Sequence, residues 1–220
     1  MGEIEIINDT KNIYIHANMI VYGNAADENI AKYIAEEIGE MWSEPKGKIL
    51  LDNEVYTLSF MTTWQYEPEL NRDDIIYNNN PRNNYFRIEE YSKIQISMVD
   101  DLGSNSGYFL KANLYEGSTT AAHEFGHTLG LRHPANMDFR GQGRPGIMYP
   151  RGTLVDAEFQ YNPLAKYGEP LHTMNPMHRR VRQEEIDLIG IPQLIYNQEL
   201  IVGKFTAIFH EMHINPTSMT

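Results

Sequence analysis

The sequence contains the segment His123-Glu124-Phe125-Gly126-His127-Thr128-Leu129-Gly130-Leu131-Arg132-His133. On a helix, His123 and His127 lie about 40° apart on one face, so both imidazoles can reach one ion. Gly130 can adopt the left-handed conformation that ends a helix and turns the chain, and this turn would bring His133 to the same ion. Zinc prefers nitrogen ligands, and a catalytic zinc site leaves one position for water. The segment therefore predicts a zinc site formed by these three histidines.

Glu124 follows the first histidine directly, so it cannot share that residue's ligand direction but can reach a zinc-bound water from the side. Zinc lowers the pKa of such a water and polarises a carbonyl, while a carboxylate can accept the proton and return it to a leaving amine. We therefore predict hydrolysis of peptide bonds with Glu124 as the general base. With typical residue usage, the complete pattern arises by chance in about one chain in a hundred thousand.

The eleven-residue segment matches the zinc signature of the metzincins, a clan of zinc metallopeptidases, and Gly146-Ile147-Met148-Tyr149-Pro150 resembles that family's Met-turn. The resemblance implies that Met148 lies under the zinc as a hydrophobic floor. The Met-Tyr-Pro form and residues 183–191 are most similar to matrixins, although Pro134 follows the third histidine where matrixins usually have serine. Residues 151–156 and those that follow are also similar to metallopeptidase domains of bacterial secreted, toxin-like proteins. Since position 150 is proline, no tyrosine stands where some metzincins place a further ligand, and we expect three histidines plus water.

This resemblance also implies the fold. We expect an α+β fold with an α/β-like upper part, in which a mixed twisted sheet carries two long helices. The zinc helix is then followed by a loop-rich lower part with the Met-turn and a C-terminal helix. We expect a catalytic domain at 1–192, with its upper part at about 1–131 and its lower part at about 132–192, and an extension at 193–220.

Residue patterns predict the individual elements. β-Branched and aromatic residues predict strands at 13–22, which we take as the first strand, and at 49–51 and 55–61, whereas apolar residues at helical spacing predict a helix at 25–42. Residues 64–92 lack a period and predict a long surface excursion. Further strands are expected at 94–98 and 108–115, followed by Ser118 as the cap of the zinc helix. Loops are expected at 134–176, a helix at about 182–188, and a strand pair or tail at 194–209.

Other residues have weaker signals. The strand at 108–115, with Tyr108, Leu110 and Ala112, is expected to offer substrate an edge for backbone pairing or to be a plain sheet strand, and Pro150 and Arg151 are expected in the wall of a substrate pocket. The acidic turn with Asp100, Asp101 and Asn105 could bind calcium, but its spacing fits no standard loop and favours a solvated turn. His210 and His213 are one residue too close for helical ligand spacing, and we treat them as structural or surface residues.

Composition limits the partners and the compartment. A net charge of -12 at pH 7 disfavours nucleic acid, and the basic run Arg179, Arg180 and Arg182 predicts a solvated face. There is no cysteine, which excludes disulfides and a thiol nucleophile. The sequence shows no signal peptide and no apolar run long enough to span a membrane, and the family resemblance favours a secreted protein. We expect a monomer.

Three functions remain compatible with these observations. The first is a zinc-dependent endopeptidase that acts on extended polypeptide. The second is a toxin or effector protease with the same chemistry and narrow specificity. The third is a non-catalytic, zinc-containing module that binds peptides, and the presence of Glu124 argues against it.

Overall fold

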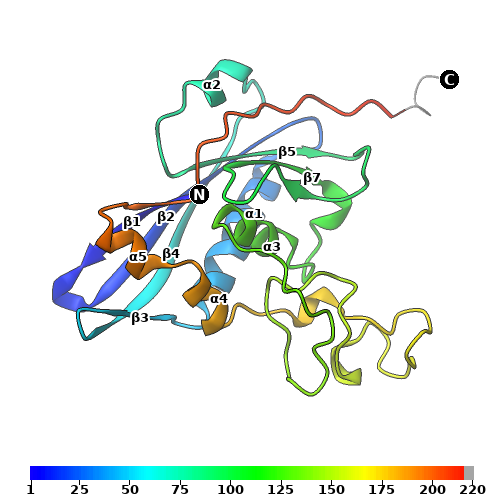
Figure 1. The fold of residues 1–220 in the computed structure, drawn as a ribbon. Coiled ribbons are helices and arrows are strands. Elements are labelled where there is room, and N and C mark those ends of the chain that lie inside the picture. Colours follow the sequence, from blue (N-terminus) through cyan, green and yellow to red (C-terminus); the bar gives the residue numbers. More distant parts are fainter. Residues whose placement is uncertain (216–220) are drawn as a thin grey trace.

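The computed structural model describes residues 1–215 as a curved mixed β-sheet with few helices (Figure 1). Six strands follow one another in the order β3-β4-β2-β5-β7-β6, and β1 and β8 lie off this path. The strands are β1 (Gly2–Ile7), β2 (Asn12–Tyr22), β3 (Lys48–Leu51), β4 (Glu54–Tyr66), β5 (Asn83–Glu89), β6 (Met98–Val99), β7 (Ser106–Leu110) and β8 (Ile201–Val202). The helices are α1 (Glu28–Ser43), α2 (Arg72–Ile76), α3 (Thr120–Thr128), α4 (Gln183–Leu188) and α5 (Ile191–Tyr196).

The long strand β2 lies at the centre of the sheet. One of its edges pairs in parallel with β4, whereas the other pairs first with β1, antiparallel, and then with β5, parallel. The strand predicted at 13–22 is therefore present, but it is the second strand and not the first. β1 carries the alternating segment Glu3-Ile4-Glu5-Ile6, in which Ile4 is buried and Glu5 is exposed, as expected for a strand with one face on the core.

Helix α1 covers one face of the sheet and packs against β4 and α3. Asp27 caps it by accepting a hydrogen bond from the Ile30 N–H at 2.8 Å, and its buried residues recur at helical spacing. Trp42 ends this apolar stripe, with its ring 5.4 Å from that of Phe60 and 6.3 Å from that of Phe125. The main hydrophobic core therefore extends directly beneath α3.

The predicted surface excursion at 64–92 is wrong, because it contains α2 and the buried strand β5. Phe86 and Ile88 point into the main core, while Arg87 and Glu89 form a buried ion pair on the opposite face. The C-terminal segment covers this face, and the backbone carbonyl of His210 accepts a hydrogen bond from Arg87 at 3.0 Å. A strand with charged residues is therefore buried on both sides, which the local sequence does not indicate.

Two further predicted strands are shorter than expected. The strand expected at 94–98 reduces to β6, and Ile94 and Ile96 are about half exposed. The strand expected at 108–115 ends at Leu110, where a 3-10 helix (Lys111–Asn113) begins. β7 pairs with both β5 and β6, so the terminal strand on this side of the sheet is β6.

Beyond α3, residues 129–182 contain turns, isolated bridges and two 3-10 helices, and lie below α3 in Figure 1, coloured yellow-green to gold. The 3-10 helices of this segment are Ala157–Phe159 and Pro176–His178. Two more 3-10 helices, Asn8–Thr10 and Lys111–Asn113, lie earlier in the chain. The helix predicted at 182–188 corresponds to α4, and α5 crosses the position expected as the domain boundary. The predicted strand pair at 194–209 is absent, because the one strand in this range, β8, pairs with β1 and not with a neighbour in the same segment. The end of the expected extension, 216–220, lies outside the described residues.

Candidate metal centre

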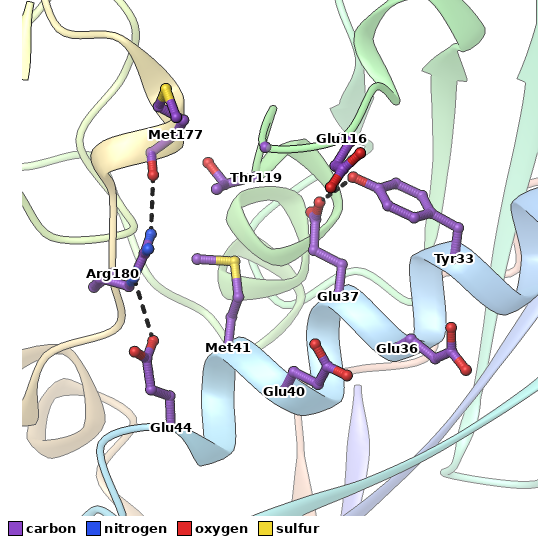
Figure 2. A pocket seen from close by; sticks show the side chains of 11 residues that line it. Tyr33, Glu36, Glu37, Glu40, Met41, Glu44, Glu116, Thr119, Met177 and Arg180 are labelled. Carbon is purple, nitrogen blue, oxygen red and sulfur yellow. Dashed lines mark hydrogen bonds and ion pairs between the residues drawn. The ribbon is translucent and has the colours of Figure 1, made fainter.

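Helix α3 carries two of the three candidate ligands and begins at Thr120, with Thr119 as its N-cap residue. Ser118, the predicted cap, accepts only from the Thr120 N–H at 3.3 Å. A second acceptor comes from α1, where Glu37 accepts from the Ala122 N–H at 3.1 Å and from the Tyr33 hydroxyl at 2.6 Å. Figure 2 shows Glu37 pointing from α1 toward the start of α3. A carboxylate is well placed there because the N-terminus of a helix has free N–H donors and positive potential.

The helix ends as the glycine predicted. Gly130 has φ +91°, its N–H donates to the His127 carbonyl at 3.0 Å, and the Leu131 N–H donates to the Gly126 carbonyl at 3.0 Å. This pair of bonds is the Schellman motif, which requires a residue in the left-handed conformation. α3 is therefore nine residues long, shorter than the second long helix that we expected, and the chain turns back before His133.

The turn brings the three imidazoles together. The Nε2 atom of His133 lies 3.0 Å from that of His123 and 3.1 Å from that of His127. Within residues 1–215 they are the only group of three or more potential ligand residues whose ligand atoms all lie within 4.8 Å of one another. A tetrahedral zinc site with Zn–N distances of about 2.0–2.1 Å places its nitrogens about 3.3 Å apart, so this spacing fits.

The other ring nitrogens of the two helical histidines are hydrogen-bonded to backbone carbonyls. His123 Nδ1 lies 2.7 Å from the Ile147 oxygen, and His127 Nδ1 lies 2.7 Å from the Leu131 oxygen. Because a carbonyl can only accept, each Nδ1 carries the proton, and each Nε2 lone pair is left for a metal. Arg179 Nη1 also lies 2.9 Å from His123 Nδ1, but the shorter contact to the carbonyl assigns the proton to the ring.

Burial lowers the pKa of all three histidines, that of His123 to well below its ordinary value, and the charge of Arg179 lowers each of them further. Desolvation disfavours the imidazolium form, so these rings are neutral at neutral pH. Neutral imidazoles with a free Nε2 are ligands that suit zinc. The donor set therefore fits the metal that the sequence predicted.

Glu124 lies beside this group and is 8% exposed. Burial raises its pKa to about 8 in the metal-free chain, whereas Arg179 and a backbone hydrogen bond from Val99 act in the opposite direction. It lines a cleft of about 360 Å³ together with the three histidines and residues of β6. The Glu124 carboxyl group thus lines the same cleft as the three histidines but does not belong to the cluster of potential metal ligands.

A turn at Gly146–Tyr149 lies under the zinc helix. Met148 is 2% exposed and packs against Gly126 of α3. A Cβ added at Gly126 would lie 2.2 Å from the Met148 sulfur, so only glycine leaves room for the methionine side chain. The carboxylate of Glu185 on α4 holds this turn, since it accepts from the Met148 N–H at 2.7 Å and the Ile147 N–H at 3.0 Å. The Ile147 carbonyl is the partner of His123, so α4 is connected to the first ligand through the turn.

The candidate substrate residues separate into two groups. Pro150 and Arg151 line a cavity that also contains His123 and Glu124. Tyr108 is fully buried, and its ring stacks on His213 at 4.1 Å. Leu110 ends the internal strand β7, which is the plain sheet strand that the sequence left as the alternative to a substrate edge, and Ala112 lies in a 3-10 helix.

Calcium binding is not supported, and the solvated turn that the sequence favoured holds for Asp101, whose side chain is exposed, but not for the buried side chains of Asp100 and Asn105. Asp100 binds His210 Nε2 at 2.7 Å, Asp101 pairs with Lys204, and Asn105 accepts from the Thr206 N–H at 3.0 Å. These side chains hold the C-terminal segment. Of the two histidines treated as structural or surface, His210 makes this ion pair and His213 stacks on a tyrosine, so both are structural.

The sequence reasoning missed three residues that support the site. Glu37 and Arg179 act over a long sequence separation, and Arg179, predicted to be solvated, is only 2% exposed. It donates to the carbonyls of Ser118 and Tyr149 at 3.0 and 3.1 Å. Glu185 had a local signal, because a glutamate in the third position of a helix commonly accepts from the N-cap N–H, and here it accepts from the Arg182 N–H at 3.0 Å.

No protein-family profile and no curated protein matches this chain. Among solved structures, the chain aligns with a crystal structure of archaemetzincin from Methanopyrus kandleri. The alignment covers 81% of this chain and 96% of that chain, with 11% sequence identity and a TM-score of 0.39. A likeness of this size does not establish a common fold.

Among the described residues, no helix is both long and apolar enough to cross a membrane.

Proposed function

We propose that this chain is a zinc-dependent endopeptidase of the metzincin type, in which His123, His127 and His133 hold the metal and Glu124 is the general base. The observation that carries the proposal is the convergence of three imidazoles, in which the Nε2 atoms of His123 and His127 lie 3.0 and 3.1 Å from that of His133, with a carboxyl group in the same cleft. Neither a packed core histidine nor a solvated one requires such an arrangement.

When bound, zinc supplies a Lewis acid that polarises a carbonyl and makes water nucleophilic at neutral pH. The carboxylate of Glu124 would accept a proton from the attacking water and return it to the leaving amine nitrogen. The positive charge of Arg179 favours the carboxylate form that a base requires. Met148 would form the floor that the family's Met-turn provides, since it packs against Gly126 between the two ligands of α3.

The cleft also suits an extended polypeptide. β6 is a terminal strand of the sheet that pairs only with β7 among the described strands, and its residues line the cleft next to Glu124. Extended peptides bind to such edges by backbone pairing, which positions a peptide bond without reading its side chains. An endopeptidase requires binding of this kind, because the substrate chain must continue on both sides of the scissile bond.

The test compares wild type with Glu124→Gln, using denatured protein and a peptide library, with and without a zinc chelator. Both proteins should bind one zinc ion, wild type should cleave, and the variant should lose about 10²–10⁴-fold in kcat, the range for a general base. Glu36→Gln, an exposed change on α1, is the matched control and should cleave like wild type.

Cleavage by Glu124→Gln at the wild-type rate would show that the base is assigned wrongly. If zinc binds but no substrate of the library is cut by wild type, the chain is a zinc-containing binding module or a protease of narrow specificity. Cleavage that is unaffected by the chelator would rule out metal chemistry.

A further inference from the structure

A second cavity, of about 300 Å³, continues the cleft on one side of the candidate metal centre. It shares four residues with the metal-lined part, namely Ile96, Ser97, His123 and Glu124. A side chain next to the scissile bond would therefore enter this cavity, and the residues that line it would select that side chain.

The cavity is cationic. Arg151 and Arg179 line it, and Glu124 is the one acidic residue among the lining residues. Both arginines line this one cavity, and burial and the charge of Arg151 lower the pKa of Arg179 to about 10. Neither arginine forms an ion pair with any residue in the range 1–215. The cavity therefore has two arginines against one carboxylate, that of the proposed base, and the charges of Glu124 and Glu37 act on Arg179.

The two arginines have different roles. All three nitrogens of the Arg179 guanidinium donate to protein oxygens, those of Thr119, Ser118 and Tyr149, so this residue contributes charge and not contacts. Arg151 is exposed, and its guanidinium lies 5.8 Å from the centre of the Tyr115 ring. Among residues 1–215 Arg151 has no hydrogen-bond partner, so its donors are available to a ligand.

Antiparallel pairing with β6 would give a bound peptide one direction across the cleft. Residues 95–97, before β6, line the cationic cavity, whereas residues 96–99, 101 and 102 line the metal side. A substrate strand that pairs antiparallel with β6 runs from the metal side toward residue 95. The residue that follows the scissile bond then lies over the cationic cavity.

We infer that this cavity binds a substrate carboxylate at the position directly after the scissile bond, with Arg151 as the contacting residue and Arg179 as a fixed positive charge. This inference rests on the proposed peptidase function and specifies its substrate class. The carboxylate has two sources, the side chain of Asp or Glu in a continuing chain, as the proposed endopeptidase requires, or the C-terminal carboxylate of the substrate, which would make the enzyme a carboxypeptidase. Arginine suits both, because its planar fork binds a carboxylate through two parallel hydrogen bonds.

The experiment uses zinc-loaded full-length protein and peptides blocked at both ends that differ only after the scissile bond, with Glu, Gln or Lys. We expect kcat/KM for Glu to exceed that for Gln by about tenfold, the effect of one charge-assisted hydrogen bond, and the Lys peptide to be the poorest. Raising the salt concentration should reduce the difference, since Arg151 is exposed.

The variants separate a specific contact from a general charge effect. Arg151→Gln should remove most of the preference for Glu over Gln, leaving the part that the charge of Arg179 contributes, and Arg151→Glu should favour Lys. Arg72→Gln removes one positive charge from an exposed position on α2 and should keep the wild-type ratio. A further pair of Gln peptides that end directly after the cleaved bond, one with a free carboxylate and one amidated, identifies the source. A preference for the free carboxylate that exceeds the Glu preference assigns the cavity to chain ends.

Equal cleavage of the Glu, Gln and Lys peptides, together with equal cleavage of the free and amidated peptides, overturns the inference and leaves the peptidase function intact. A preference for acids only before the scissile bond overturns it as well. If no peptide is cut, the proposed function fails, and binding of labelled Glu and Gln peptides to the zinc-loaded protein decides the inference. Tighter binding of the Glu peptide that is lost in Arg151→Gln supports the inference, and equal binding of the two peptides overturns it.

Discussion

The substitution Glu185→Gln should weaken zinc binding although Glu185 lies on α4 and touches no ligand. Its carboxylate accepts from the backbone N–H groups of Ile147 and Met148, and also from that of Arg182 at 3.0 Å. Burial raises the pKa of Glu185, and these three donors oppose the shift. Because the Ile147 carbonyl orients His123, a looser turn is expected to loosen the first ligand.

The magnitude follows from the number of acceptors. Glutamine has the same shape, which matters because Gly146 packs directly against this carboxylate, but it replaces one acceptor oxygen with a donor. At least one N–H of the turn then faces an NH₂ group, and an unpaired buried donor costs about 1–3 kcal/mol of stability. Loss of a hydrogen bond that supports a metal ligand typically costs about 10–100-fold in metal affinity.

Two assays check this prediction: urea unfolding of the metal-free chain, and zinc affinity by competition with a chromogenic chelator. The matched control is Glu184→Gln, because Glu184 is the neighbouring residue but its carboxylate is exposed and pairs only with Arg182. We expect wild-type values for the control and losses in both assays for Glu185→Gln. Unchanged zinc affinity in Glu185→Gln would refute the proposed connection from α4 to His123.

Three further predictions concern the helix end, its packing and its protonation. Gly130→Ala should lower the free energy of unfolding by about 1–2 kcal/mol, measured by urea titration, and weaken zinc binding. The reason is the backbone conformation, because φ is +91° at Gly130 and an added Cβ would meet nothing within 4 Å. The control Gly152→Ala, which is equally open but has no left-handed φ, should be near neutral in the same titration. Gly126→Ala should lower the unfolding free energy by about 1–3 kcal/mol, since its Cβ would collide with Met148, and wild-type stability would disprove this packing. Burial lowers the pKa of His123 from 6.5, so the unfolded state takes up protons first and the metal-free chain should lose stability as the pH falls below about 6.5. Urea midpoints between about pH 7.5 and 5 should show a shallower slope for His123→Gln.

The local sequence predicts the candidate metal ligands and the base because these residues all lie within a few positions of one another in the chain. The i, i+4 histidines and Gly130 determine the helix face, its end and the return of His133, all within eleven residues. The same holds for α1, where an apolar stripe ends at Trp42, and for the hairpin of β3 and β4. Each depends on periodicity or turn chemistry that can be read from a short window.

The missed features depend on residues distant in sequence. Arg87 and Glu89 in β5 look like loop residues until the C-terminal segment covers them, more than 120 residues later. Arg179 looks solvated because its acceptors are carbonyls about 30 and 60 residues away. β1 is a different case, because its alternating Ile and Glu residues indicate a strand from the local sequence alone.

The most direct test of the central claim is an anomalous-difference map measured at the zinc edge on crystals of the zinc-loaded protein. We predict one strong peak about 2.0–2.1 Å from Nε2 of His123, His127 and His133, with the Glu124 carboxylate nearby but outside the ligand shell. A peak elsewhere, no peak, or coordination by fewer than three of these rings would contradict the account.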